Sequence, residues 1–161
     1  MGLDLSVWLA ERLERTYVDG NWSGKGVRPA LDGVTPAEAH WRPVPAQHTI
    51  AEIAAHMAYW CWKAAQWLDP DAVADPGEEE WRPVAPSPAA WLEVQLELER
   101  AHAACAAVIR RLIPEALAEP YRPGGPGPWT KLDVVVDLAT HDSYHAAQVF
   151  VLRRWYAAAQ A

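Results

Sequence analysis

Apolar residues recur at intervals of three and four positions in four long stretches of the chain, which is the spacing of one face of an α-helix. These stretches cover residues 5–18, 50–68, 88–113 and 131–156. The alternation of apolar and polar residues that marks a half-buried strand does not occur, and no segment repeats another. Four amphipathic helices without strands predict an all-α fold, and more specifically a four-helix bundle.

Capping signals support these helix boundaries. Thr49 followed by Glu52 has the form of a capping box at the start of the second helix. Ser87, which precedes a proline, is a good N-cap for the third helix, and Thr130 is a good N-cap for the fourth. Pro114 cannot continue a helix, so we expect it to end the third one.

The connections between the helices are long and rich in proline. They cover residues 20–48, 69–87 and 114–129. The first contains a Thr-Pro-Ala-Glu sequence at 35–38, which predicts a short extra helix with its own cap. The acidic run at 78–80 is interpreted as a solvated loop. Connections of this length are uncommon in simple bundles and are often functional.

Length and composition fit one soluble domain over residues 1–161, because 161 residues with 51% apolar content suffice for a hydrophobic core. No run of about 18 apolar residues occurs, so no membrane span is expected. The N-terminus does not resemble a secretory signal, which favours the cytoplasm. A net charge of −7 without a basic cluster argues against a nucleic-acid partner.

The cysteines and tryptophans are interpreted mainly as core residues. Cys61 and Cys105 lie in apolar helical stretches and do not form a C-x-x-C motif, so we expect two reduced, buried thiols. Ten tryptophans are unusual for this length, and some of them could line a cavity. A purely structural interpretation is a homodimer formed through exposed aromatic side chains, for which the candidates are Trp22, Trp41, Trp81 and Trp155.

A pair of histidines in the fourth helix carries the clearest chemical signal. His141 and His145 are four residues apart, so their Cβ atoms are roughly 6 Å apart on one helix face and their rings could chelate one metal ion. Val134, Leu138 and Leu152 lie on the same face, so both rings should point inward. A shared metal ion would give a partner to imidazole nitrogens that burial removes from water.

A third ligand should come from a neighbouring helix. His56 lies at the margin of the apolar face of the second helix, and His102 lies within the apolar face of the third. Spacing alone does not choose between them. His40 and His48 fall outside the long helices and are interpreted as surface residues.

Three segments resemble the DinB-like (DinB/YfiT) superfamily of metal-binding helix bundles. They are residues 31–43 leading into 49–56, residues 126–132, and the His-Asp-Ser-Tyr-His-Ala-Ala-Gln sequence at 141–148. In that family one metal-binding histidine comes from the second helix and two come from the last helix. The resemblance therefore implies metal ligation by His56, His141 and His145, and leaves His102 as a core or cavity-facing residue.

Two positions near the histidine pair bear on how well the chain matches the family. Ala147 stands where a frequent family ending, H-x-G-Q, has glycine, whereas Gln148 matches that ending and should brace the site. Asp142 has two interpretations, a carboxylate that orients an imidazole ligand or a solvated surface acid, because it is turned about 100° from its neighbour along the helix.

Three neutral imidazoles would leave an open coordination position, which suits catalysis better than a structural role. Imidazole suits several divalent transition metals, of which zinc and nickel are favoured here. The resemblance implies a thiol-dependent S-transferase that binds a low-molecular-weight thiol, such as bacillithiol or mycothiol, together with a small-molecule substrate. A metal-dependent hydrolase and a non-catalytic, stress-response module that binds a metal or a ligand are the alternatives. Candidates for the cavity wall are Tyr59, Trp60, Trp129 and Tyr144, and no general acid or base is identified.

Overall fold

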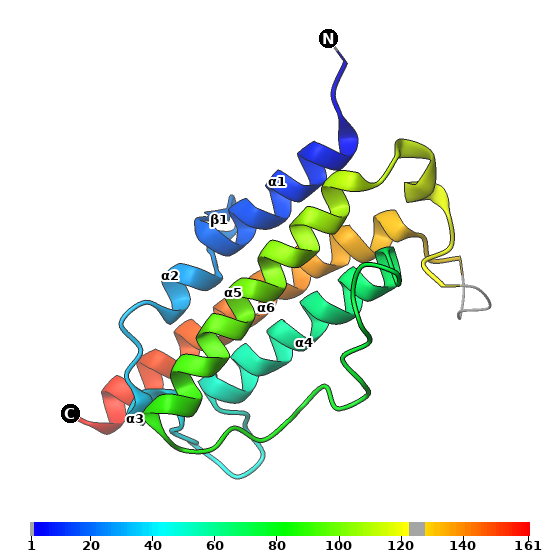
Figure 1. Cartoon of the computed structure of the whole chain (residues 1–161). Helices are drawn as coiled ribbons and strands as arrows, with labels where there is room; N and C mark the ends of the chain where they lie inside the picture. Colours follow the sequence, from blue (N-terminus) through cyan, green and yellow to red (C-terminus); the bar gives the residue numbers. More distant parts are fainter. Residues whose placement is uncertain (1, 123–127) are drawn as a thin grey trace.

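Four long helices form the body of the protein in the computed structural model, which describes residues 2–122 and 128–161 (Figure 1). They are α1 (Leu5–Val18), α4 (Ile50–Leu68), α5 (Pro88–Arg111) and α6 (Lys131–Ala159). The predicted all-α class is confirmed, and the first two helices have the predicted bounds. The third ends two residues before the predicted limit, and the fourth continues three residues beyond it.

The local sequence explains where these helices begin. The Asp4 carboxylate accepts hydrogen bonds from two backbone amides in the first turn of α1. Complete capping boxes open α4 and α6, formed by Thr49 with Glu52 and by Thr130 with Asp133. The Ser87 hydroxyl accepts a bond from the third residue of α5. The two helices that carry the candidate ligands therefore have fixed starting points.

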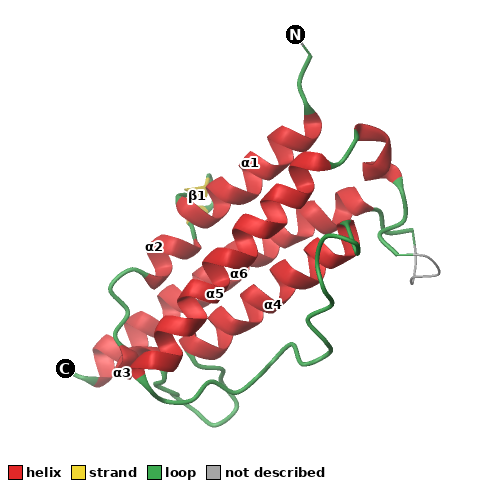
Figure 2. Cartoon of the chain, in the orientation of Figure 1, coloured by secondary structure: helices red, strands yellow, loops and turns green. Residues whose placement is uncertain are grey.

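Each long helix packs against two others in a closed arrangement. Helix α4 contacts α5 and α6 on one side of the bundle, and α1 contacts the same two helices on the other side (Figures 1 and 2). The core between them is filled by fully buried side chains, of which the largest are Leu13, Ile50, Ile53, Met57, Leu98 and Ile109. Because α4 is held on both sides, its inner face is fixed relative to that of α6.

Short elements fill the connections. Two strands of two residues each, β1 (Gly20–Asn21) and β2 (Gly24–Lys25), form a hairpin that is followed by α2 (Val27–Leu31). Helix α3 (Pro36–Ala39) is the short helix that the sequence predicted. The hairpin was not predicted, because two residues are too few for apolar alternation to appear. Its turn depends on Gly20, where φ is 113° and an added Cβ would lie 2.2 Å from a backbone oxygen.

The remaining connections differ in how much of them is described. A 3-10 helix, η1 (Pro114–Ala118), follows α5. Residues 123–127, which include the first two residues of the family-like segment 126–132, lie outside the described residues. Within the described ranges no helix combines the length and the apolar character needed to cross a bilayer.

The connection between α4 and α5 runs back along α4 and is tied to it by a buried lysine (Figure 1). Lys63 Nζ lies 2.8 Å from Asp75 Oδ1, 3.1 Å from the Gly77 carbonyl and 3.3 Å from Glu78 Oε1. Tyr59 Oη also donates to the Gly77 carbonyl, at 3.0 Å. The acidic run is therefore more than the solvated loop that the sequence suggested, since its backbone is anchored against α4.

Replacing Lys63 with methionine should release this connection, because the substitution keeps an unbranched side chain one atom shorter but removes the charge and the three hydrogen bonds. Amide hydrogen exchange around Gly77 should accelerate by about tenfold. This factor corresponds to about 1.4 kcal/mol, the net contribution of roughly one hydrogen bond to holding the loop closed. Lys131→Met is the matched control, because Lys131 pairs with Glu119 in a different connection. Equal exchange around Gly77 in both variants would show that Lys63 does not hold the loop.

Candidate metal centre

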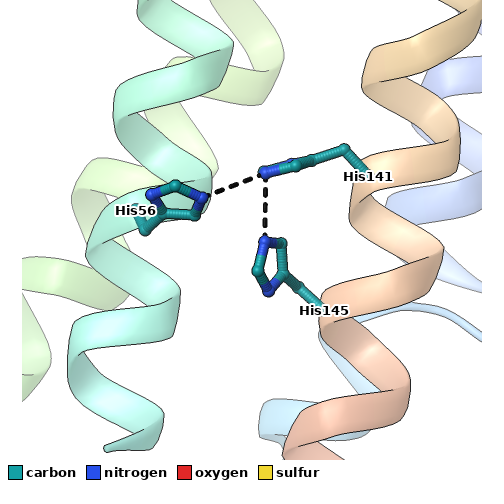
Figure 3. A group of neighbouring side chains, drawn as sticks. All are labelled: His56, His141 and His145. Atoms are coloured by element: carbon teal, nitrogen blue, oxygen red, sulfur yellow. Dashed lines mark hydrogen bonds between the residues drawn. The ribbon is translucent and has the colours of Figure 1, made fainter. Parts of the chain in front are cut away.

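Three histidine rings from two helices meet at one point inside the bundle (Figure 3). His56 projects from α4, and His141 and His145 project from successive turns of α6. The Nε2 atom of His141 lies 3.2 Å from Nε2 of His56 and 3.0 Å from Nε2 of His145. The family resemblance implied these three residues as one cluster, and the structure brings their ring nitrogens together.

The outer nitrogens of two of these rings bind oxygen acceptors. His56 Nδ1 lies 3.1 Å from the backbone carbonyl of Glu80, and His145 Nδ1 lies 2.7 Å from Oε1 of Gln148. An oxygen acceptor requires a proton on the facing Nδ1, so Nε2 of each neutral ring carries a lone pair directed at the centre of the cluster. Ligating histidines are commonly oriented through their second nitrogen in this way.

The three inward nitrogens cannot satisfy one another by hydrogen bonds alone. His56 and His145 both present lone pairs, and Nε2 of the neutral His141 ring could donate a proton to only one of them. A divalent ion would accept all three lone pairs. Two ligands on a tetrahedral ion with bonds of roughly 2.1 Å are about 3.4 Å apart. The two Nε2–Nε2 distances from His141, 3.2 and 3.0 Å, are within a few tenths of an ångström of that value. The donor set therefore fits a metal ion.

Burial keeps the rings neutral, as metal ligation requires. Loss of hydration, together with the neighbouring His145, lowers the pKa of His56 to about 4 and that of His141 to about 3. Burial also lowers the pKa of His145, although its hydrogen bond to Gln148 opposes this shift. All three rings are thus neutral at neutral pH, and each keeps one nitrogen lone pair that a metal ion could accept.

An indole ring from the connection between α4 and α5 covers the cluster. Trp81 stacks in parallel on His56, with ring centroids 3.7 Å apart, and on His48 at the same distance. The sequence suggested Trp81 as part of an exposed dimer surface, but the structure places it against a candidate ligand. Trp41, from the same set, packs its ring edge against Tyr156, while Trp22 and Trp155 are exposed.

His102, the rival third ligand, lies away from the cluster and faces Asp142. His102 Nε2 is 3.3 Å from Asp142 Oδ2, and both side chains are buried. The distance fits a charge contact, although the angles do not meet those of a hydrogen bond. Asp142 is therefore neither a solvated surface acid nor a hydrogen-bond partner of the three clustered imidazoles. It points from α6 towards α5.

The two cysteines lie near this buried pair as free thiols. Cys61, His102 and Asp142 bring their donor atoms within 4.8 Å of one another. Burial, with the nearby Asp142 carboxylate, raises the pKa of the Cys61 thiol and raises that of Cys105 to about 12. Both cysteines thus remain protonated core residues, as the sequence predicted.

Two pockets of about 490 Å³ each reach the histidine cluster from different sides. Trp60 and His141 line both of them. The first, the aromatic pocket, also includes Trp67, Tyr121, Trp129 and Leu138. The second, the polar pocket, also includes His48, Glu80, Tyr144 and Gln148. Three of the four predicted cavity residues, Trp60, Trp129 and Tyr144, line a pocket, whereas Tyr59 instead binds the Gly77 carbonyl.

Comparison with known proteins agrees with this architecture. A model of the DinB superfamily matches residues 11–149, which include all three clustered histidines. The chain belongs to the DinB superfamily. No curated protein and no solved structure matches it. Membership explains the shared helix bundle, and the DinB-like histidine cluster could hold a metal ion.

Three contributors to this DinB-like site were not identified from the sequence. The Glu80 carbonyl and the Trp81 ring belong to a connection, where no periodic pattern indicates the direction of a side chain. Asp137 lines the aromatic pocket one helical turn before His141. Its spacing of four residues from His141 was the available signal, because such residues share a helix face.

The stability of the metal-free protein should depend on pH through these rings. The pKa values of His56 and His141 in the folded state lie below the value of about 6.5 in an unfolded chain. The unfolded state therefore binds more protons, so the free energy of unfolding is retained above pH 6.5 and is lost as the pH falls towards 4 and then 3. The free energy of unfolding should change by up to about 1.4 kcal/mol per pH unit for each of these histidines.

Urea unfolding in the presence of a chelator, measured from pH 7 to pH 4, checks this expectation. His141→Gln should flatten the dependence, because glutamine does not titrate. His40→Gln is the control, since His40 caps α3 and has no contact with the cluster. An identical slope in the His141 variant and the unaltered protein would contradict the assignment.

Proposed function

We propose that the protein is a metal-dependent enzyme in which His56, His141 and His145 hold a divalent ion, zinc or nickel, for thiol S-transfer. The convergence of the three Nε2 atoms supports this proposal most strongly. Among the described residues, no fourth side chain joins the group as a donor. Three protein ligands and an open position are typical of catalytic rather than structural sites.

The residues around the cluster would hold the ligands in place. The Glu80 carbonyl and Gln148 Oε1 fix the protonation of two rings, and Gln148 Nε2 is in turn fixed by Tyr144 Oη at 2.9 Å. Trp81 covers one face of His56 and would exclude water from it. The chemistry that a bound ion supplies is stabilisation of the thiolate form of a coordinated thiol.

The two pockets give this reaction a place for each reactant. A low-molecular-weight thiol carries polar groups, which suits the pocket lined by His48, Tyr144 and Gln148. In the transfer, the thiolate sulfur forms a bond to an electrophilic carbon, the leaving group departs with its electron pair, and the thiol proton passes to solvent. The cytoplasmic location remains a prediction from the sequence.

Metal loading is the first test. The purified protein should take up about one equivalent of zinc or nickel, and His145→Ala should weaken binding by at least about a hundredfold, measured by competition with a chelator. His48→Ala is the matched control, because His48 stacks on the same Trp81 but contributes no nitrogen to the cluster. Uptake below roughly a tenth of an equivalent after reconstitution would end the proposal.

Turnover is the second test. The metal-loaded protein should accelerate conjugation of a small thiol to monochlorobimane, and His145→Ala should reduce that rate by at least about a hundredfold. His40→Ala should keep most of the rate, because His40 lines neither pocket and gives no nitrogen to the cluster. Tight metal binding without conjugation across several thiols would favour the non-catalytic module that binds metal or ligand. Metal-dependent cleavage of an ester without any thiol would favour the hydrolase.

A further inference from the structure

We infer that the aromatic pocket binds an uncharged, planar aromatic compound beside the histidine cluster. This inference rests on the proposed function in one respect, since it identifies that compound as the class of electrophile. The binding site itself follows from the pocket's lining, size and charge, which do not depend on any reaction.

Four aromatic rings from two parts of the chain form the pocket. Helix α4 contributes Trp60 and Trp67, whose ring centroids are 5.8 Å apart at an angle of 62°. Tyr121 packs against Trp67 at 4.8 Å and 59°. Rings set at such angles offer both faces and edges, which are the two surfaces that a planar aromatic ligand contacts favourably. Trp129 completes the set.

The backbone holds the two non-helical aromatics in place without a ligand. The Tyr121 amide donates to the Trp129 carbonyl at 3.3 Å, and the Lys131 amide donates to the Glu119 carbonyl at 3.0 Å. This short antiparallel pairing joins the segment after η1 to the start of α6. Tyr121 and Trp129 are therefore attached to the same helix that carries His141 and His145.

The pocket has room for more than one aromatic ring. Its volume is about 490 Å³, whereas a dry cavity of roughly 150 Å³ accepts benzene. Two or three fused rings would therefore fit. Ala64, Val134 and Leu138 supply the aliphatic part of the wall, and the whole lies within the size range of small-molecule sites.

Charge in the lining disfavours an anion. Asp137 is the single charged side chain among the described residues that line the pocket. The nearby Arg122 does not line it; its guanidinium lies over the rings of Tyr121 and Trp67, at 5.4 and 6.0 Å from their centroids. A carboxylate or sulfonate in this pocket would meet the Asp137 charge without an opposing cation in the lining, so an uncharged ligand fits best.

The pocket reaches the cluster through two side chains. His141 is both part of its wall and the central ring of the cluster. Trp60 lies against His56 and His141, with centroids 6.3 Å from each. These two residues also line the polar pocket, so they are the shared wall between an apolar and a polar compartment. An aromatic ligand and a polar thiol could thus approach the same point, each through its own pocket.

Binding of 2-naphthol by isothermal titration calorimetry tests the inference, with naphthalene-2-sulfonate as the charged analogue. The unaltered protein should bind the naphthol at least about tenfold more tightly than the sulfonate. Trp129→Ala and Trp67→Ala should each weaken naphthol binding by about tenfold or more. Trp129 is half-exposed and lies outside the helices, so its removal does not threaten the fold. Trp22→Ala is the control, because Trp22 is 94% exposed and lines a different pocket.

Repeating the titration with a chelator present separates this inference from the metal proposal. Naphthol binding that survives metal removal and falls in the Trp129 and Trp67 variants supports the pocket, even if no metal or turnover is found. Binding that is equal in Trp129→Ala and Trp22→Ala, tighter binding of the sulfonate, or no binding of naphthol at all would overturn it.

Discussion

The burial of three imidazole rings at one point is the constraint on which the site depends. A buried neutral imidazole still has one donor and one acceptor nitrogen, and leaving either unpaired costs free energy. The Glu80 carbonyl and Gln148 accept from two outer nitrogens, so these acceptors determine that the lone pairs point inward. An acceptor of lone pairs at the centre is then the partner that the three inward nitrogens lack.

The bundle provides the rigidity that this geometry needs. His56 and the pair on α6 lie on different helices, so their convergence depends on how α4 and α6 are rotated and offset. Capping boxes fix where both helices begin, and a close-packed core prevents them from sliding. The connection after α4 is tied down by Lys63, which places Glu80 and Trp81 against His56.

The helices and the histidine pair could be predicted from the sequence, because both follow from spacings of three and four residues along the chain. The same periods could not separate His56 from His102, since each lies on an apolar face. What separates them is the rotation of α5, which turns His102 towards Asp142. Before the structure, only the family resemblance favoured His56 over His102 as the third ligand. Glu80 and Trp81 escaped prediction for a different reason. Their positions are set by Lys63, a charge within a largely buried helix face, and its partners cannot be found from spacing.

The distribution of charge around the site limits what an ion there would attract. Three neutral imidazoles would leave the full charge of a divalent ion uncompensated, and the described residues add no carboxylate ligand to the cluster. The wall on one side is almost wholly apolar, so a compensating anion would have to arrive from the polar side, where Tyr144 and Gln148 lie. A thiolate meets this requirement because it brings one negative charge on a soft ligand atom. On the aromatic side, the charge of Asp137 then disfavours a second anion and leaves that pocket to a neutral reactant.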